Sequence, residues 1–407
     1  MPSLSKTSLS VPASGIRRIF ELANELDDVI QLSIGEPEIA VAPHILEAGS
    51  SAWSDDVTNY TPNSGMALLR TAIAEKLQSH NGYAVDHDQI HVTAGGAQAL
   101  HMAMCMTLSS GDEVLVPNPG YATFTMAAKL VGAVPVPYEL TSERGFTPSI
   151  EGLEKLVTAN TKALLVNSPS NPLGVVYSRE VLAELLNFAA RNDLWIISDE
   201  VYEYLTFGSD FLSMAAIDRC NRVFGVYSLS KTYALTGARV GYLVTPPGMA
   251  EVFRAAQEAI VSCVNTASQL AAVAAIGGDQ SHVAEARNHY RSNIEAACRL
   301  LDDRGLRYQK PGGAFYLWID VSHASQGDVA GWAEQFLIQE RVAVAPGTAF
   351  GSAGEGWIRI SLAGRSKALL EALGRLPAAA GLGGIHVASG SPVQIRPLNQ
   401  RQEVLIT

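Results

Sequence analysis

The stretch Trp195-Ile196-Ile197-Ser198-Asp199-Glu200-Val201-Tyr202 joins a short apolar run to a group of polar residues. Six other segments also have the character of strands, several of them almost wholly apolar: Ile90–Thr93, Glu113–Val116, Ala133–Tyr138, Lys162–Asn167, Arg222–Tyr227 and Arg239–Val244. Strands that are buried on both faces of a mainly parallel sheet have this composition. Helical patterns such as Ala97–Leu108 and Arg179–Arg191 lie between them. The sequence therefore predicts an α/β fold with a mainly parallel, mixed seven-stranded sheet flanked by helices.

The sequence changes in character after residue 250. A long helical run from Met249 to Gly277 is followed by a second, which begins near Ala284 and ends near Leu301. Two later segments, Phe315–Val321 and Trp357–Leu362, alternate like strands of a smaller, partly exposed sheet.

These patterns predict two domains. We expect a large domain over residues 46–282 and a smaller α+β domain over residues 283–377, with the N-terminal segment, residues 1–45, joining the smaller one. Residues 378–407 are rich in Ala, Gly and Ser and lack periodicity, so we expect a loosely structured tail there.

The composition excludes several classes of function. The 407 residues carry 29 basic and 40 acidic side chains, a formal charge of −11, so a nucleic-acid partner is not expected. No apolar run is long enough to cross a bilayer, and the N-terminus has no continuous apolar segment of signal-peptide length. The four cysteines form no CxxC pair, which fits a reducing compartment. We therefore expect a cytoplasmic enzyme that acts on small molecules.

Polar clusters follow several of the predicted strands. Thr93–Gln98 contains Gly95 and Gly96 where a strand meets a helix, and glycines there let backbone N–H groups approach an anion. The second cluster, Asn167–Gly174, has closely spaced Asn and Pro residues that favour a rigid loop. In isolation, an ordinary tight turn explains either cluster equally well or better.

The third cluster places a carboxylate, Asp199, at the end of an apolar strand, where burial is costly unless the group meets a cation. Tyr202 lies three residues on and could turn toward the same cavity. Glu200 is expected to cap a helix or to face solvent. A helix N-cap is an equally good explanation of Asp199 taken alone.

The fourth cluster, Ser228–Thr232, holds Lys231 among small hydroxyl residues. Lysines normally lie on solvated faces, and a surface position is the simplest explanation of this residue alone. A desolvated pocket and a nearby Arg239 would both lower the pKa of an amine and favour its nucleophilic neutral form. The four clusters together provide a phosphate cradle, an acid, a phenol and a lysine that can form a Schiff base. These groups are what pyridoxal 5′-phosphate (PLP) requires.

The motifs of the chain resemble, in order and spacing, those of the class I and II aminotransferases, the aspartate-aminotransferase-like PLP enzymes. The resemblance covers roughly residues 10–377. It rests on these segments: Leu32–Pro37, Tyr60–Gly65, Gly95–Leu100, Pro119–Tyr121, Asn167–Gly174, Asp199–Tyr202, Ser228–Lys231, Arg239–Tyr242, Pro346–Gly347, Phe350–Gly351 and Trp357–Ser361.

The resemblance implies a role for each cofactor-site residue. Lys231 would hold PLP as a Schiff base and move the proton, and Asp199 would keep the pyridine nitrogen protonated. Tyr202 and Asn171 would hydrogen-bond the phenolic oxygen of the ring. Tyr121 would stack on the ring face. The remaining residues would hold the phosphate: the N–H groups of Gly96 and Ala97, with Ser228, Arg239 and, from a neighbouring subunit, Tyr60.

The resemblance also implies the substrate contacts and the assembly. Arg359 would bind the substrate α-carboxylate as a bidentate pair, and the backbone of Gly35 would close over the substrate, beside Asn171. Tyr60 implies a homodimer with shared sites. The chain departs from the common family pattern at Ala97, where a hydroxyl residue is frequent, and at Leu173, where Thr is common. Without the resemblance, we would expect Arg359 to lie on a solvated face of a strand.

We therefore expect an aminotransferase that exchanges the amino group between an α-amino acid and a 2-oxo acid by a ping-pong mechanism. β- and γ-lyases, synthases, and cyclising or oxidative enzymes of natural-product pathways would need the same core residues, so they remain the alternative. A metal site is not expected, since only His87 and His91 stand four residues apart and they do not share a helix face. The segment Ile260–Gln269 has no arginine for a side-chain carboxylate, which leans against a strict dicarboxylate specialist.

Overall fold

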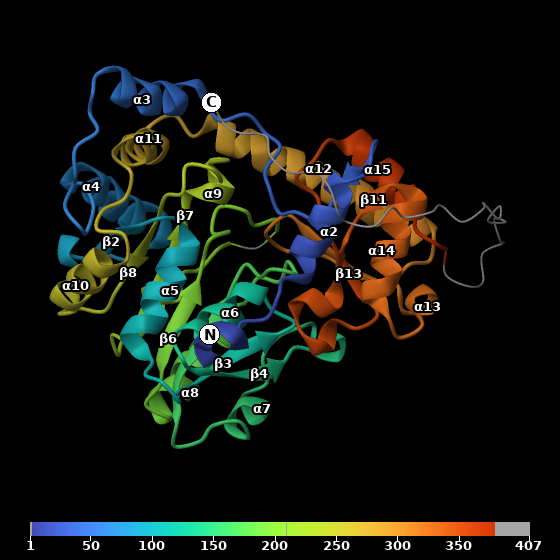
Figure 1. Cartoon of the computed structure of the whole chain (residues 1–407), viewed down its shortest axis with the longest axis horizontal. Coiled ribbons are helices and arrows are strands. Elements are labelled where there is room, and N and C mark those ends of the chain that lie inside the picture. Colours follow the sequence, from blue (N-terminus) through green and yellow to red (C-terminus); the bar gives the residue numbers. More distant parts are fainter. Residues whose placement is uncertain (1, 209, 379–407) are drawn as a thin grey trace.

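The computed structural model describes residues 2–208 and 210–378, in which helices surround sheets of seven, four and two strands (Figure 1). The predicted tail lies outside the described residues, apart from residue 378. Among the described helices, none is long and apolar enough to span a membrane.

The larger sheet has the predicted seven strands. Their order is β2-β8-β7-β6-β5-β3-β4, with bounds β2 Ile90–Thr93, β3 Glu113–Asn118, β4 Val134–Glu139, β5 Thr161–Asn167, β6 Trp195–Asp199, β7 Val223–Ser228 and β8 Gly241–Val244. Only β8 runs antiparallel to its two neighbours. The prediction of a mixed, mainly parallel sheet is confirmed.

Both faces of this sheet are buried, which explains the apolar runs in the sequence. In β5, Leu164 and Val166 pack in one hydrophobic cluster with the helix α8 (Arg179–Arg191). Their neighbours Ala163 and Leu165 belong to the cluster on the opposite face, beneath α5 (Gly96–Thr107). Because successive side chains of a strand point to opposite faces, a strand covered on both sides needs apolar residues at every position.

The remaining helices of this part lie around the sheet. Their bounds are α3 Pro43–Ser54, α4 Ala67–Lys76, α6 Ala122–Leu130, α7 Ile150–Glu154, α9 Leu229–Thr232, α10 Ala250–Ile260 and α11 Thr266–Gly277, with a π-helical turn η1 at Leu77–Asn81. The single helix predicted from Met249 to Gly277 is wrong. Ser262 has a φ of +62°, outside the helical range, and the Asn265 side chain accepts from the Ser268 N–H to start α11. The next helix, α12 (Ser281–Asp303), begins a few residues before the predicted start.

The second part of the molecule, at the right in Figure 1, is built on the four-stranded antiparallel sheet β12-β13-β10-β9. Its elements are β9 Tyr308–Gln309, β10 Tyr316–Asp320, β12 Ala345–Pro346, β13 Trp357–Ser361, and the helices α13 Ser322–Ser325, α14 Val329–Glu340 and α15 Ser366–Gly374. The two strands predicted from alternation correspond to β10 and β13.

Most of the N-terminal segment packs on this second part. The helix α2 (Gly15–Asn24) contacts α14, and the strand β1 (Ile30–Gln31) pairs with β11 (Val342–Ala343). The first helix, α1 (Lys6–Ser10), instead contacts α6 beside the large sheet (Figure 1). Ile19 and Leu32 belong to the same hydrophobic cluster as residues of α12, α14 and α15. These contacts support our proposal of a large domain over residues 46–282 and a small one that combines residues 1–45 with 283–377.

Candidate active site

A cavity of about 440 Å³ lies at the carboxyl edge of the large sheet, where it meets the small sheet. All the predicted site residues line it except Tyr60: Gly35, Gly96, Ala97, Tyr121, Asn171, Asp199, Tyr202, Ser228, Lys231, Arg239 and Arg359. They converge because the parallel strands β2, β3, β5, β6 and β7 all end at this edge. The antiparallel β8 begins there, which brings in Arg239 from the residues just before it.

Lys231 lies in the short helix α9, directly after β7. Its Nζ donates a hydrogen bond to the backbone carbonyl of Gly35 at 2.7 Å. Burial is the main cause that lowers the pKa of Lys231 from 10.5 to about 8, and the nearby positive charges of Arg359 and Arg239 lower it further. Its amine is therefore neutral more often at neutral pH than that of an exposed lysine.

Asp199 is the last residue of β6, and its side chain is buried in the cavity wall. One carboxylate oxygen accepts from the Val201 N–H at 3.3 Å. Burial raises the pKa of Asp199 from 3.8 to about 7, against the opposing effects of that hydrogen bond and of Lys231. Among the described residues the carboxylate has no ion-pair partner, and a bound cation would stabilise its charged form.

The start of α5 forms a cradle for an anion. Gly95 has a φ of +80°, and a Cβ built there would lie 2.7 Å from Nη2 of Arg239, so only glycine fits. Gly96 and Ala97 are the first residues of α5, where N–H groups have no partner within the helix. The Ser228 hydroxyl lies at the same place and caps α9 through the Ser230 N–H at 3.2 Å.

Arg359 lies on β13 of the small sheet and is 2% exposed, so the expectation from the residue alone, a solvated strand face, is wrong. Its guanidinium carbon is 4.3 Å from the Tyr316 ring centroid and 4.9 Å from that of Phe350. Nη1 donates to Oδ1 of Asn171 at 3.0 Å, and Nη2 donates to the Ser33 carbonyl. Nε is buried and has no hydrogen-bond partner among the described residues. The guanidinium can therefore still bind an anion.

The two remaining predicted residues are tyrosines. Tyr121 precedes α6 and is 37% exposed at the cavity. Tyr60 is 91% exposed and does not line the cavity of its own chain.

Tyr316 was missed by the sequence analysis. Its hydroxyl is 2.8 Å from that of Tyr202, and a Cβ at Gly35 would collide with it. Glycine at position 35 therefore makes room for this phenol. The only signal in the sequence was the alternation of the strand Phe315–Val321, which does not reveal what lies opposite Tyr316.

The expectation that Glu200 caps a helix or faces solvent is wrong. Its side chain is buried and does not line the cavity. It accepts hydrogen bonds from the Ser198 hydroxyl at 2.9 Å, the Met214 N–H at 2.9 Å and the Tyr227 hydroxyl at 2.8 Å. These three donors compensate for the lost hydration.

A second cavity of about 540 Å³ adjoins the first and shares Tyr121 with it. Its charged residues are Arg18, Lys129 and Glu334, of which Arg18 and Glu334 pair with each other. The smaller cavity holds the convergent buried polar groups and the titratable side chains with shifted pKa values, so we assign the active site there.

Known proteins resemble this chain in both sequence and structure. The family described as Aminotransferase class I and II matches residues 27–376. An aromatic-amino-acid aminotransferase of Thermococcus litoralis is 37% identical over 92% of this chain and 97% of its own length. An aspartate aminotransferase of Pyrococcus abyssi is 38% identical, with coverages of 90% and 95%. The structure of the Thermus thermophilus aspartate aminotransferase with maleate superposes with a TM-score of 0.88 at 33% identity, over 92% of this chain and 99% of that one.

Proposed function

We propose roles for the individual cavity residues from one premise, which is that this chain belongs to the class I and II aminotransferases. It is a PLP-dependent enzyme that moves an amino group between an α-amino acid and a 2-oxo acid. The names of its relatives favour transamination over the lyase, synthase and oxidative alternatives.

The cavity fits the cofactor group by group. The glycine cradle at Gly95 and Gly96 with Arg239 suits a phosphate, and the buried carboxylate of Asp199 suits a protonated ring nitrogen. The Tyr202 hydroxyl and the Lys231 amine suit the phenolic oxygen and the aldehyde. When bound, PLP acts as an electron sink that makes the proton on the substrate α-carbon acidic.

Lys231 would hold the cofactor covalently and then carry the α-proton on Nζ. Its lowered pKa supports both roles, because only the neutral amine can attack a carbonyl or accept a proton. The hydrogen bond from Nζ to the Gly35 carbonyl fixes the direction of the amine when the cofactor is not attached.

Asp199 would ion-pair with the ring nitrogen and keep it protonated. The absence of a close positive partner in the cavity as described is the observation that supports this role. Tyr202 would donate to the phenolic oxygen from its place beside Tyr316, and Asn171 would do so from beside Arg359. Tyr121 would cover one ring face.

The phosphate would be held by Gly96, Ala97, Ser228 and Arg239. At Ala97 the chain offers an N–H group but no hydroxyl. The Arg239 guanidinium lies beside Gly95 and donates from Nη1 to the Thr236 carbonyl at 2.9 Å, so it would meet the phosphate at the cradle.

The enzyme would act as a homodimer. Tyr60 protrudes from the surface and would contact the phosphate bound by the other subunit. The sequence around Tyr60 exposes large apolar side chains: Leu46, Trp53 and Leu68 are each between 56% and 62% exposed. Burial of these side chains would stabilise association. We further propose a cytoplasmic location from the cysteine content.

Arg359 would bind the substrate α-carboxylate. Its guanidinium is fixed by Asn171 and by two aromatic rings, and the uncompensated Nε supports an anionic ligand. Around the carboxylate the cavity wall is apolar at Ile16, Ile34 and Met126, with Arg17 also lining it. This wall suits an apolar or aromatic amino donor, and Arg17 could pair with a second carboxylate.

The experiment that tests the proposal follows the cofactor itself. Addition of an amino donor to the purified holoenzyme should convert the cofactor to its amine form with one equivalent of oxo acid released. A 2-oxo acid should then restore the original spectrum. Ammonia release or oxygen consumption in place of this cycle would contradict the proposal.

A further inference from the structure

Asp199 at the end of β6 and Tyr202 just after it are each followed directly by a buried glutamate. Asp199 precedes Glu200, and Tyr202 precedes Glu203. Both glutamates are buried, and neither lines the cavity. Glutamate is almost never fully buried unless it is paired, so each of these two side chains needs polar partners inside the protein.

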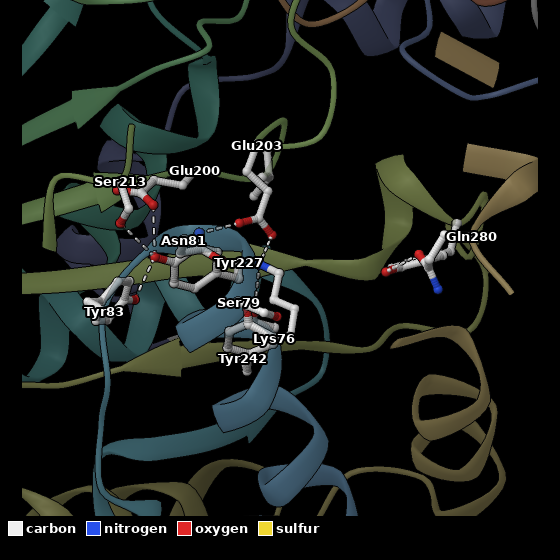
Figure 2. A network of polar contacts seen from close by, with 12 residues as sticks. Lys76, Ser79, Asn81, Tyr83, Glu200, Glu203, Ser213, Tyr227, Tyr242 and Gln280 are labelled. Atoms are coloured by element: carbon white, nitrogen blue, oxygen red, sulfur yellow. Dashed lines mark hydrogen bonds and ion pairs between the residues drawn. The ribbon is translucent and has the colours of Figure 1, made fainter. Parts of the chain in front are cut away.

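Glu203 is held through both of its carboxylate oxygens. Lys76 forms an ion pair with Oε1, and Nδ2 of Asn81 donates to Oε2 at 2.6 Å. Figure 2 shows the carboxylate between these two side chains. The Lys76 ammonium also donates to the Tyr242 hydroxyl at 3.1 Å and lies 5.0 Å from the centroid of the Tyr227 ring. A carboxylate bound at both oxygens has a fixed orientation.

The π-helical turn explains how two residues of one helix reach the same carboxylate. Lys76 ends α4, and Asn81 ends the π turn, five positions later. In an α-helix residues five apart point about 140° away from each other. A turn closed by i to i+5 hydrogen bonds instead brings them to one face, and such turns are frequent at functional sites.

Glu200 connects the same turn to β7, the strand directly before the helix that carries Lys231. It accepts from the hydroxyl of Tyr227, which itself contacts the Tyr83 hydroxyl at 2.8 Å. Tyr227 directly precedes Ser228 on β7. The Glu203 N–H donates to the Glu200 carbonyl at 3.0 Å, so both glutamates belong to one hydrogen-bonded turn.

We propose that Lys76 and Asn81 are positioning residues for the cofactor, acting through the Glu203 carboxylate to fix the turn that presents Asp199 and Tyr202 to the ring. This inference rests on the proposed roles of those two cavity residues. Because hydrogen-bond geometry tolerates only small displacements, a loosened turn weakens both contacts although neither side chain has changed.

The experiment uses the holoenzyme and removes both charges at once. The double variant Lys76→Met/Glu203→Leu replaces a buried ion pair by apolar residues, which preserves folding far better than either single change. Asn81→Ala keeps the ion pair and removes only the second contact. The control is Tyr138→Phe, which deletes a buried hydrogen bond of 2.9 Å to the Leu165 carbonyl in the same sheet.

Two properties are measured: the dissociation constant of PLP, and the pH midpoint of its visible absorbance. For the double variant we expect about tenfold weaker binding, as when the outer support of a bound group is removed. We also expect a midpoint moved by about one pH unit, equivalent to one hydrogen bond. Asn81→Ala should change the dissociation constant and the pH midpoint in the same directions as the double variant, but by smaller amounts.

The outcomes separate this inference from the function it rests on. Unchanged binding and midpoint in the folded double variant and in Asn81→Ala would overturn the positioning role, as would equal changes in Tyr138→Phe. Asp199→Asn is the reference, because it should weaken PLP binding and shift the midpoint strongly. If Asp199→Asn alters neither property, the proposed cofactor contact itself is wrong.

Discussion

The two faces of the turn from Asp199 to Glu203 differ in how their charges are compensated. On the cavity face, Asp199 is buried with one weak hydrogen bond, and burial raises its pKa to about 7. On the opposite face, Glu200 and Glu203 have donors or a cation at every carboxylate oxygen. The protein itself compensates the charges of Glu200 and Glu203, whereas the charge of Asp199 is left to be compensated by a ligand.

This difference shows how one short segment can be both rigid and reactive. A carboxylate that is fully compensated lowers the energy of one geometry and resists displacement. A carboxylate without a close cation has a raised pKa and a free-energy gain available on binding. Substitutions on the two faces of the turn should therefore have different effects.

The largest effect is expected on the cavity face, at Lys231. Lys231→Ala removes the group that carries the proton, and general acid–base catalysis accounts for up to about 10⁴-fold in rate. We expect kcat/KM to fall by at least that factor and the visible absorbance of the lysine-bound cofactor to disappear. A purified variant that keeps its absorbance band and its rate would refute the role of this lysine.

The opposite face should respond in stability. Lys76→Met leaves Glu203 buried without its cation, so the free energy of unfolding should fall by about 3–5 kcal/mol. The double variant Lys76→Met/Glu203→Leu should recover most of this loss. Denaturant unfolding of both proteins checks the prediction, and a double variant no more stable than the single one would show that the face is not compensated in this way.

The sequence was sufficient for most of the large domain and most of the cavity. The strands were predictable because burial on both faces leaves an unbroken apolar run. Gly96, Asp199 and Lys231 were predictable because they stand at or just after strand ends, whereas Gly35 and Arg359 were expected at the site only from the resemblance to the family. The contacts of Lys76 and Asn81 with Glu203 could not be predicted. Lys76 and Glu203 are far apart in the sequence, and the π turn that aligns Lys76 with Asn81 has no compositional signal. Tyr316 was missed for the same reason, because a strand pattern does not specify its neighbours.

The raised pKa of Asp199 should make the stability of the protein depend on pH. In the cofactor-free protein its pKa is about 7, above its ordinary value of 3.8, so between those values the folded state binds more protons than the unfolded state. Its contribution to stability is therefore complete at low pH and is lost as the pH rises from about 4 to about 7. Asp199→Asn should remove this decline. Equal slopes of unfolding free energy against pH in the two proteins would contradict it.

Tyr316→Phe should have a smaller effect. It removes the hydroxyl 2.8 Å from that of Tyr202 but keeps the ring that stacks on Arg359. A hydrogen bond of this kind contributes about 0.5–1.5 kcal/mol, so we expect kcat/KM to fall between about twofold and tenfold. The effect should be absent in a Tyr202→Phe background, because the two hydroxyls act together. Additive effects in the double variant would show that they do not.

The smallest effect concerns Arg17 at the cavity. Its side chain is 66% exposed and pairs with Glu21 at 3.5 Å, so its charge is strongly solvated. An exposed ion pair contributes about 0.2–1 kcal/mol, which corresponds to a KM change of roughly fivefold at most. Arg17→Ala should raise the KM for a dicarboxylic amino donor by this factor and leave that for phenylalanine unchanged. Equal changes for both donors would show that Arg17 shapes the cavity entrance without binding the second carboxylate.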